Sequence, residues 1–229
     1  NALPVCITNP PALVYTAGYY VTELEIPNNS AGFSISYQTC CRIDNIENTA
    51  DEIGATYSAN IPGSLILGTT LTSSSPRFNT GISVVCYNQP FTLDFSATDP
   101  DSDSLVYSLC NAFSGGGATS GSSNPSNYGT PAAPPFPSIP YTNGYTGLTP
   151  LGSQATINSQ TGIISGIAPA SGKYVVSVCI RSFRNGQFIG DHTKDFIITV
   201  APCDFSKDQL DISYTNCKDF TLNFKNNNN

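Results

Sequence analysis

The stretch that most constrains the fold is KYVVSVCIRS, residues 173–182, because its side chains alternate in character. Successive side chains of a strand point to opposite faces, so this pattern predicts a strand. One face would carry Tyr174, Val176, Val178 and Ile180, and the other Val175, Ser177, Cys179 and Arg181. Asn185-Gly186 is a tight-turn signal, and the apolar residues 188–200 follow it. We therefore expect a long hairpin here.

The composition favours β-structure in the rest of the chain as well. Of 229 residues, 39% are hydrophobic, which is enough to form cores, and only 11% are charged. Gly, Pro, Ser, Thr and Asn are abundant, which favours short strands joined by turns over helices. Further strands are expected at residues 19–26, 33–37, 55–61, 64–71, 83–87, 91–96, 155–158 and 162–166. The fold class predicted from these patterns is all-β.

Eight cysteines and a single histidine indicate disulfides rather than a zinc site of mixed Cys and His ligands. An even number of cysteines in β-rich sequence is typical of an oxidising compartment outside the cytoplasm. On strand proximity we favour Cys110 with Cys179, and Cys203 with Cys217. Neighbouring cysteines rarely bond each other, so Cys40 and Cys41 are expected to pair with distant partners, Cys6 and Cys86.

Charge and termini limit the function classes further. The net charge of -7 argues against nucleic acid as a partner, because the chain cannot displace cations from a phosphate backbone. No apolar run is long enough to span a membrane, and no signal peptide is recognisable. Methionine is absent, so we expect a processed or excised piece of a longer protein.

Three aspartates, Asp99, Asp101 and Asp103, interrupt the alternating stretch at residues 95–109. Carboxylates so close together repel one another unless a cation or hydrogen-bond donors lie among them. The expected cofactor is calcium, a hard cation that binds carboxylates. The spacing lacks the Gly and Glu of an EF-hand, so the expected site is a loop between strands instead. Asp191 and Asp195 would complete the cage if the fold brings them near. The alternative is an Asx-turn that caps a strand, with the carboxylates in water.

A loop rich in Gly, Ser and Pro spans residues 114–140, and it has no periodic pattern of its own. Four aromatic residues lie on or beside it, namely Tyr128, Phe136, Tyr141 and Tyr145. Exposed aromatics are natural contact surfaces for sugar rings or protein partners, which makes these the candidate ligand-binding residues. The alternative is that they hold the loop against the sheet.

Five motifs taken in order resemble the extracellular β-sandwich modules of large Bacteroidota surface proteins. They are CCRIDNI, SSPRF, VVCYNQPFTLDFSATDPDSDSLVYSL, TGIISG and GKYVVSVCIRSFRNGQFIGDHTKDF. Such proteins carry cadherin-like, Ig-like and PKD-type repeats, are secreted by the type IX system, and serve in adhesion or gliding motility. The resemblance implies tandem antiparallel β-sandwich domains tied by disulfides. The acidic motif of that family usually has Gly where this chain has Ser102.

On this resemblance the chain divides into three parts. Residues 1–86 would form an N-terminal β domain, and residues 87–202 a cadherin-like or Ig-like sandwich that contains the 114–140 loop. Residues 203–229 would begin a PKD-like module or provide an exchanged strand, since they include the alternating sequence FTLNF.

The function expected from the sequence is non-catalytic, in a cell-surface protein that acts in adhesion or gliding, with calcium adding rigidity. No catalytic motif is recognisable, and the lone His192 has no paired nucleophile, so we assign it to surface structure. Two alternatives remain open, a carbohydrate-binding module and a filament subunit that assembles by strand addition. The expected partners are neighbouring domains of the same polypeptide, surface glycans or proteins.

Overall fold

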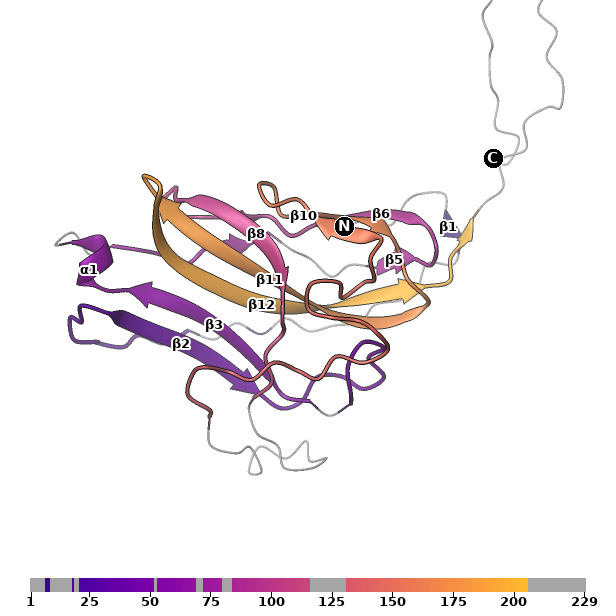
Figure 1. Ribbon diagram of the computed structural model, residues 1–229, viewed down its shortest axis with the longest axis horizontal. Helices are drawn as coiled ribbons and strands as arrows, with labels where there is room; N and C mark the ends of the chain where they lie inside the picture. Colours follow the sequence, from indigo (N-terminus) through magenta and orange to yellow (C-terminus); the bar gives the residue numbers. More distant parts are fainter. Residues whose placement is uncertain are drawn as a thin grey trace, which may run out of the picture. The chain divides into compact units, whose positions relative to one another are not determined.

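A computed structural model describes residues 7–8, 18, 21–51, 53–68, 72–79, 84–115 and 131–205 (Figure 1). The chain forms two units. One comprises Asn1 and Tyr15–Pro202, and the other comprises Ala2–Val14 and Cys203–Asn229. The described strands of the second unit are β1 (Ile7–Thr8) and β13 (Asp204–Phe205), which pair antiparallel.

The first unit is built on a six-stranded sheet with the order β2-β3-β12-β11-β8, in which β5 also pairs with β12. Every pair is antiparallel except that between β5 and β12. The strands are β2 (Gly32–Thr39), β3 (Ala55–Pro62), β5 (Val84–Cys86), β8 (Ser104–Cys110), β11 (Gly172–Arg184) and β12 (Gln187–Ala201). The long hairpin expected from the sequence is therefore present as β11 and β12, whose turn is Asn185-Gly186.

Smaller elements complete the unit. A three-stranded antiparallel sheet has the order β6-β10-β9, formed by Pro90–Asp94, Ile163–Ile167 and Ala155–Ile157 respectively. A two-stranded pair joins β4 (Arg77–Phe78) to β7 (Ala97–Thr98). The helix α1 (Ser64–Leu67) is a single turn. Within the described ranges, no helix has the length and apolar character needed to cross a membrane.

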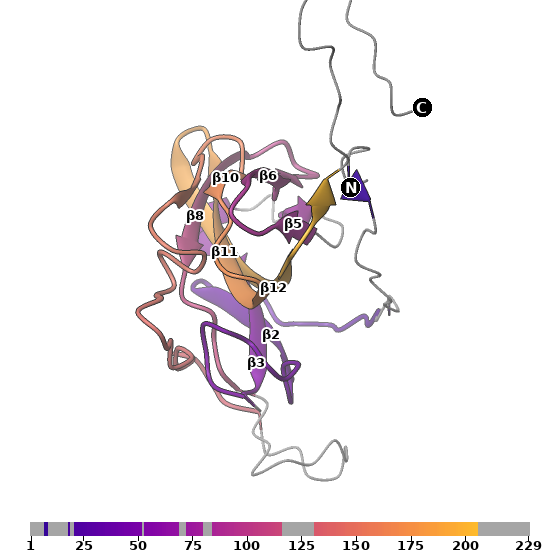
Figure 2. The ribbon, with the colours of Figure 1, turned by 90° about the vertical axis from the view of Figure 1, so that its right-hand side faces the viewer.

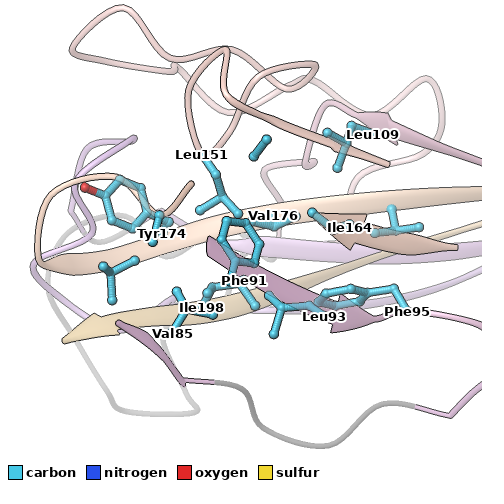
Figure 3. Packing of buried hydrophobic residues seen from close by; sticks show 14 of the residues in the cluster. Val85, Phe91, Leu93, Phe95, Leu109, Leu151, Ile164, Tyr174, Val176 and Ile198 are labelled. Atoms are coloured by element: carbon cyan, nitrogen blue, oxygen red, sulfur yellow. The ribbon is translucent and has the colours of Figure 1, made fainter. Parts of the chain in front are cut away.

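The main core contains side chains from both larger sheets (Figure 3). The predicted apolar face of β11 enters it, with Tyr174 at 1% exposure and Val176, Val178 and Ile180 fully buried. Phe91 and Leu93 of β6 and Ile164 of β10 pack in the same cluster. The alternation that the sequence shows in β11 is thus used to form this core.

The other face of β11 is buried too. Val175 joins a second, smaller cluster with Ile46, Ala112 and Ile139. Tyr141 and Ile197 pack against that cluster. The side chains of β11 thus join a core cluster on each face of the strand, which lies between β8 and β12 in the sheet (Figure 2).

Two expected strands differ from the structure. Ser64–Leu67 is the helix α1, because an apolar run as short as SLIL does not fix a helical or a strand period. Residues 21–29 form no strand, and Val21 and Leu24 are 91% and 71% exposed. An alternating sequence becomes a strand only where a neighbouring strand takes up its backbone hydrogen bonds, and among the described residues no strand pairs with this segment, whose Asn29 instead accepts the backbone N–H of Ser64.

The domain boundary expected at residue 86 falls inside one sheet. Both β3 and β5 precede it, yet both pair with β12. Alternation alone gives no information about which strands pair across such a distance. The first unit therefore continues from Tyr15 to Pro202.

Candidate functional site

The acidic loop that connects β7 to β8 is a compact turn. One carboxylate oxygen of Asp99, Oδ1, accepts hydrogen bonds from the backbone N–H groups of Asp101 (2.8 Å) and Asp103 (3.1 Å). Ser102 has a φ of 63°, in the left-handed region that favours Gly. This turn brings the three carboxylates together, with one oxygen of each within 4.8 Å of the others.

Arg184, the last residue of β11, binds this loop. Its Nε donates to Oδ1 of Asp103 (2.7 Å) and its Nη2 donates to Oδ2 (2.8 Å), a bidentate pair. Nη2 also lies 3.5 Å from a carboxylate oxygen of Asp101. The hydrogen bonds to Asp103 raise the pKa of Arg184. A guanidinium therefore lies where the sequence predicts a cation.

Arg184 neutralises only part of the negative charge of the loop. Three carboxylates face one guanidinium, and Oδ2 of Asp99 is buried with no hydrogen-bond donor among the described residues. Asp101 accepts a hydrogen bond from the backbone N–H of Ser74. The oxygens of Asp99 and Asp101 suit a hard cation, whereas Arg184 already binds both oxygens of Asp103. The loop fits calcium in part.

Asp191 and Asp195 do not join the loop, contrary to the extended cage considered from the sequence. Asp195 lies opposite Ser177 in the ladder, whereas the acidic loop enters β8 opposite Phe183. These positions on β11 are separated by about 20 Å at the usual rise of a strand. Asp191 accepts a hydrogen bond from Asn60 of β3. The candidate metal ligands are thus Asp99, Asp101 and Asp103.

Asp195 instead forms a buried ion pair with Arg42, and both side chains are 4% exposed. Arg42 also donates to the carbonyl oxygens of Gly54 and Phe113, the latter at 2.8 Å. Burial raises the pKa of Asp195, and burial likewise raises that of Tyr57, whose hydroxyl group hydrogen-bonds Asp195. Arg42 thereby links Asp195 of β12 to the residue that precedes β3 and to Phe113, which forms a bridge with Thr56 of β3. Its only sequence signal was its place in the CCRIDNI motif.

A second polar residue that the sequence analysis did not single out is Asn48, which is fully buried. Its amide nitrogen donates to the carbonyl oxygens of Pro150 and Val175, each at 2.9 Å. Its amide oxygen accepts the backbone N–H of Val175 (3.0 Å). Asn48 therefore satisfies the backbone of β11 in the way that a neighbouring strand would. No local motif signals this role.

The aromatic residues of the 114–140 loop region make internal contacts. The hydroxyl oxygen of Tyr141 accepts the backbone N–H of Ala112 (3.0 Å). The ring of Phe136 lies 5.8 Å from that of Phe113, and the ring of Tyr145 lies 5.5 Å edge-on from that of Tyr174. Tyr128 lies outside the described residues. These three contacts agree with the alternative that the aromatics hold the loop region to the sheet.

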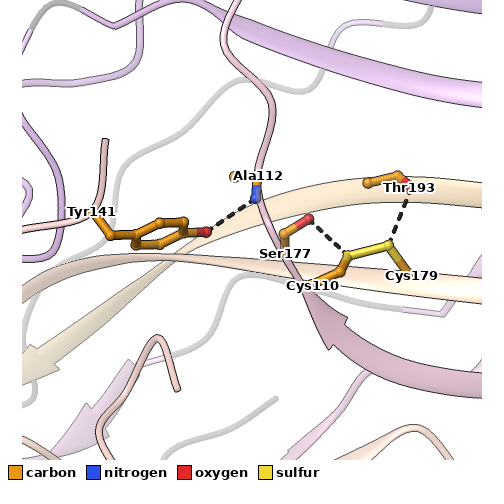
Figure 4. Close-up of a disulfide and its surroundings, with 6 residues drawn as sticks. All are labelled: Cys110, Ala112, Tyr141, Ser177, Cys179 and Thr193. Atoms are coloured by element: carbon orange, nitrogen blue, oxygen red, sulfur yellow. Dashed lines mark hydrogen bonds between the residues drawn. A yellow bond between two sulfur atoms is a disulfide. The ribbon is translucent and has the colours of Figure 1, made fainter. Parts of the chain in front are cut away.

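Cys110 of β8 and Cys179 of β11 form a disulfide, the pair favoured from strand proximity (Figure 4). The hydroxyl groups of Ser177 and Thr193 lie 3.5 Å and 3.3 Å from its two sulfur atoms. Cys86 and Cys203 are also disulfide-bonded. Several disulfides indicate an oxidising, extracytoplasmic environment.

Cys40 and Cys41 bond each other, which corrects the expectation that each has a distant partner. The peptide bond between them is cis, and their Cα atoms lie 3.0 Å apart. The expectation rested on the rarity of bonds between neighbouring cysteines, whose disulfide geometry is hard to reach. Cys6 and Cys217 lie outside the described residues.

His192 is more buried than a surface residue would be. Its ring packs edge-on against Phe78 with 5.6 Å between ring centres, and its Nδ1 is buried with no hydrogen-bond partner among the described residues. Burial and, secondarily, Lys194 lower the pKa of His192. Its surroundings are those of a neutral side chain at the border of the core.

The sequence of the chain matches no protein-family model, and comparisons with curated proteins and with solved structures also give no match. The contacts described above are therefore the basis for assigning a role.

Proposed function

We propose that the chain is a non-catalytic, Ig-like or cadherin-like segment of a large bacterial cell-surface protein that acts in adhesion or gliding motility. Its charged and amide side chains support this role. Arg42, Asp195, Asn48, Asp103 and Arg184 all bind other parts of the chain, so the polar clusters of the described residues hold the structure together. Such a use of polar groups is typical of a structural module.

The compartment supports the same role. The disulfides indicate an oxidising environment, and the five ordered motifs resemble modules of type IX-secreted Bacteroidota proteins. The partners that follow from this proposal are the neighbouring domains of the same polypeptide and a surface glycan or protein.

Labelling of intact cells tests this role in the bacterium that produces the chain. Antibodies raised against the purified chain should label unpermeabilised cells, and deletion of the corresponding coding region should reduce attachment or gliding. A strain that carries the intact region restored at another locus is the control. Label that appears only after permeabilisation, or a deletion strain with normal attachment and gliding, would refute the proposal.

The acidic loop adds a second element to the proposal, a calcium ion held by Asp99, Asp101 and Asp103. The buried and unpartnered Oδ2 of Asp99 supports it, as does the clustering of the three carboxylates. A bound cation at this position would stiffen the connection between β7 and β8.

Calcium binding is measured by terbium luminescence and by thermal melting of the chain with calcium or with EDTA. We expect a calcium-competable terbium signal and a melting temperature that falls in EDTA. Asp99→Asn should remove both effects, while Asp44→Asn, on an exposed residue outside the loop, should leave them unchanged. Equal melting in calcium and EDTA, with no terbium signal, would contradict the calcium proposal and leave the surface role untouched.

A further inference from the structure

Residues 72–79 form a strap that belongs to neither of the two larger sheets. Its one strand, β4 (Arg77–Phe78), pairs with β7 over two residues. The backbone N–H of Asn79 also donates to the carbonyl oxygen of Ser96 (2.9 Å). A short pair of this kind opens more easily than a strand that is paired along its whole length, as β11 is with β12. The strap therefore depends on the contacts at its two ends.

At one end the strap contacts the acidic loop. The backbone N–H of Ser74 donates to a carboxylate oxygen of Asp101. The carbonyl oxygen of Thr72 accepts a hydrogen bond from Nη1 of Arg184 (3.1 Å), the side chain that also binds Asp103. The strap thus takes part in the same network of contacts as the three carboxylates.

At the other end Phe78 anchors the strap to the core. Its ring packs edge-on against His192, with 5.6 Å between ring centres, and against Phe196, with 5.3 Å. Phe78 is partly buried against the main core cluster, and Pro76 is buried as well. His192 forms one wall of the site that holds Phe78, so a change in its charge acts directly on this anchor.

The strand that carries His192 favours a neutral ring. Nδ1 of His192 is buried and has no hydrogen-bond partner among the described residues. Alternation along β12 places Lys194 on the same face as His192, and places Asp191 and Asp195 on the other face. A cation therefore shares the face of the ring, whereas the carboxylates of the same strand lie on the opposite side.

The neighbouring strands supply no carboxylate either. Ile180 of β11 and Ala59 of β3 lie opposite His192 in the sheet. No Asp or Glu occurs in β3, β4, β7 or β11. Tyr57 shares the face of Ala59 and stays neutral, because burial raises its pKa, and Arg77 of β4 is an exposed cation. An imidazolium at this position would have no counter-ion on the strands that surround it.

Protonation therefore opposes the packed position of the ring. Burial and, to a smaller extent, Lys194 lower the pKa of His192. The stability that such a group contributes is full above its unfolded pKa, ~6.5 for histidine, and is lost as the pH falls toward the folded pKa. Movement of the charged ring into water removes one wall of the site of Phe78. We propose that acid releases the strap: His192 takes up a proton and leaves its packed position, and residues 72–79 separate from the core.

Release of the strap also affects the acidic loop. It removes the N–H of Ser74 from Asp101 and the carbonyl oxygen of Thr72 from Arg184. The strap thereby couples the charge of His192 to the contacts of the three carboxylates. This device goes beyond the proposed surface role and does not depend on it.

Proton NMR of the full chain tests the uptake of the proton, because the chain contains a single histidine. Its imidazole resonance should titrate with a midpoint below ~6.5. In Lys194→Gln the midpoint should move upward, since the neighbouring positive charge is removed. A wild-type midpoint at or above the ordinary value, or no upward shift in Lys194→Gln, would overturn the proposal.

Hydrogen exchange of the backbone amides, measured by mass spectrometry, tests the release. Protection of residues 72–79, corrected for the intrinsic effect of pH on exchange, should fall by up to about tenfold from pH 7.5 to pH 5.5, since each pH unit below the unfolded pKa contributes up to about a factor of ten. Protection of β11 should stay unchanged. Equal protection of the strap at both pH values, or an equal loss in β11, would contradict the proposal.

The matched variants are His192→Gln and His192→Phe, whose side chains take up no proton in this range. Both should keep the protection of the strap at pH 5.5. Burial also raises the pKa of Asp195, but a proton taken up there acts alike in the wild type and in the variants. Equal far-UV circular dichroism and melting at pH 7.5 confirm that a variant folds. A folded variant that loses strap protection as the wild type does would refute the role of His192.

Discussion

Arg42 and Arg184 both bind aspartates, but they do so in different surroundings. Arg42 and Asp195 are each 4% exposed, and no local sequence spacing connects them. Arg184 is 31% exposed, and its partner Asp103 is 2% exposed. An ion removed from water depends on its partner far more than an ion that water can reach. The buried pair of Arg42 and Asp195 therefore holds the structure in place. In the more exposed pair of Arg184 and Asp103, another cation can partly replace the guanidinium.

The most severe test of this comparison is Arg42→Ala. It leaves Asp195 buried without its counter-ion and removes the donors to Gly54 and Phe113. We expect a loss of about 3–5 kcal/mol in the free energy of unfolding, the usual cost of breaking a buried pair. Urea denaturation monitored by circular dichroism measures it.

Two further variants make this result specific. Arg181→Ala, at an exposed arginine that lies over the rings of Phe183 and Phe188, should cost only about 0.5–1 kcal/mol. The double variant Arg42→Met/Asp195→Leu should recover most of the loss, since it leaves no isolated charge. If Arg42→Ala lowers the free energy of unfolding no more than Arg181→Ala does, the stabilising role assigned to Arg42 is wrong.

Breaking the pair of Arg184 and Asp103 should lower the free energy of unfolding by less. Arg184→Ala removes a bidentate pair that solvent partly reaches, and we expect a loss of about 1–2 kcal/mol. Calcium should restore part of that stability in the variant, because it would take over the charge that Arg184 supplies. Denaturation of Arg184→Ala with and without calcium measures both effects. A calcium effect larger in the wild type than in the variant would show that Arg184 does not compete with the ion.

The smallest expected effect is the pH dependence of the stability that Asp195 contributes. Burial raises the pKa of Asp195, so folding takes up a proton at pH values between the unfolded and the folded pKa. The stability from this proton uptake is full below the unfolded pKa of ~3.9 and is lost as the pH rises through the folded pKa. Relative to Asp195→Asn, the wild type should therefore lose stability as the pH rises above ~4, by about 1.4 kcal/mol for each unit of pKa shift. Urea unfolding of both proteins from pH 3 to pH 8 measures how the stability of each depends on pH. A wild type that becomes more stable relative to Asp195→Asn as the pH rises would contradict this prediction.

The local part of the fold could be predicted from the sequence. The alternation of Tyr174, Val176, Val178 and Ile180 identified β11 and its core face. Every second side chain of a strand lies on the same face, so the pattern can be read directly from the sequence. Asn185-Gly186 identified the turn of the hairpin for a similar reason. The acidic loop was also visible, since its three aspartates are close in the sequence.

The long-range part could not be predicted in this way. Arg42 meets Asp195 153 positions later, and Arg184 meets Asp103 81 positions earlier. These contacts follow from which strands pair, and alternation carries no information on that choice. The same lack of information placed a domain boundary near Cys86, although β5 pairs with β12. Cys40 and Cys41 were misjudged because a general rarity of bonds between neighbouring cysteines does not decide any one pair.

The disulfide between Cys110 and Cys179 has a mechanical consequence for a chain that is pulled at its two ends. It joins positions 69 residues apart, so the chain between them forms a closed loop. When the two ends of the polypeptide are pulled apart, force passes through the sulfur atoms and bypasses that loop. At ~3.5 Å per extended residue, about 240 Å of chain is withheld from stretching. Under tension, the segment would lengthen far less than its residue count suggests, and reduction would release the hidden length.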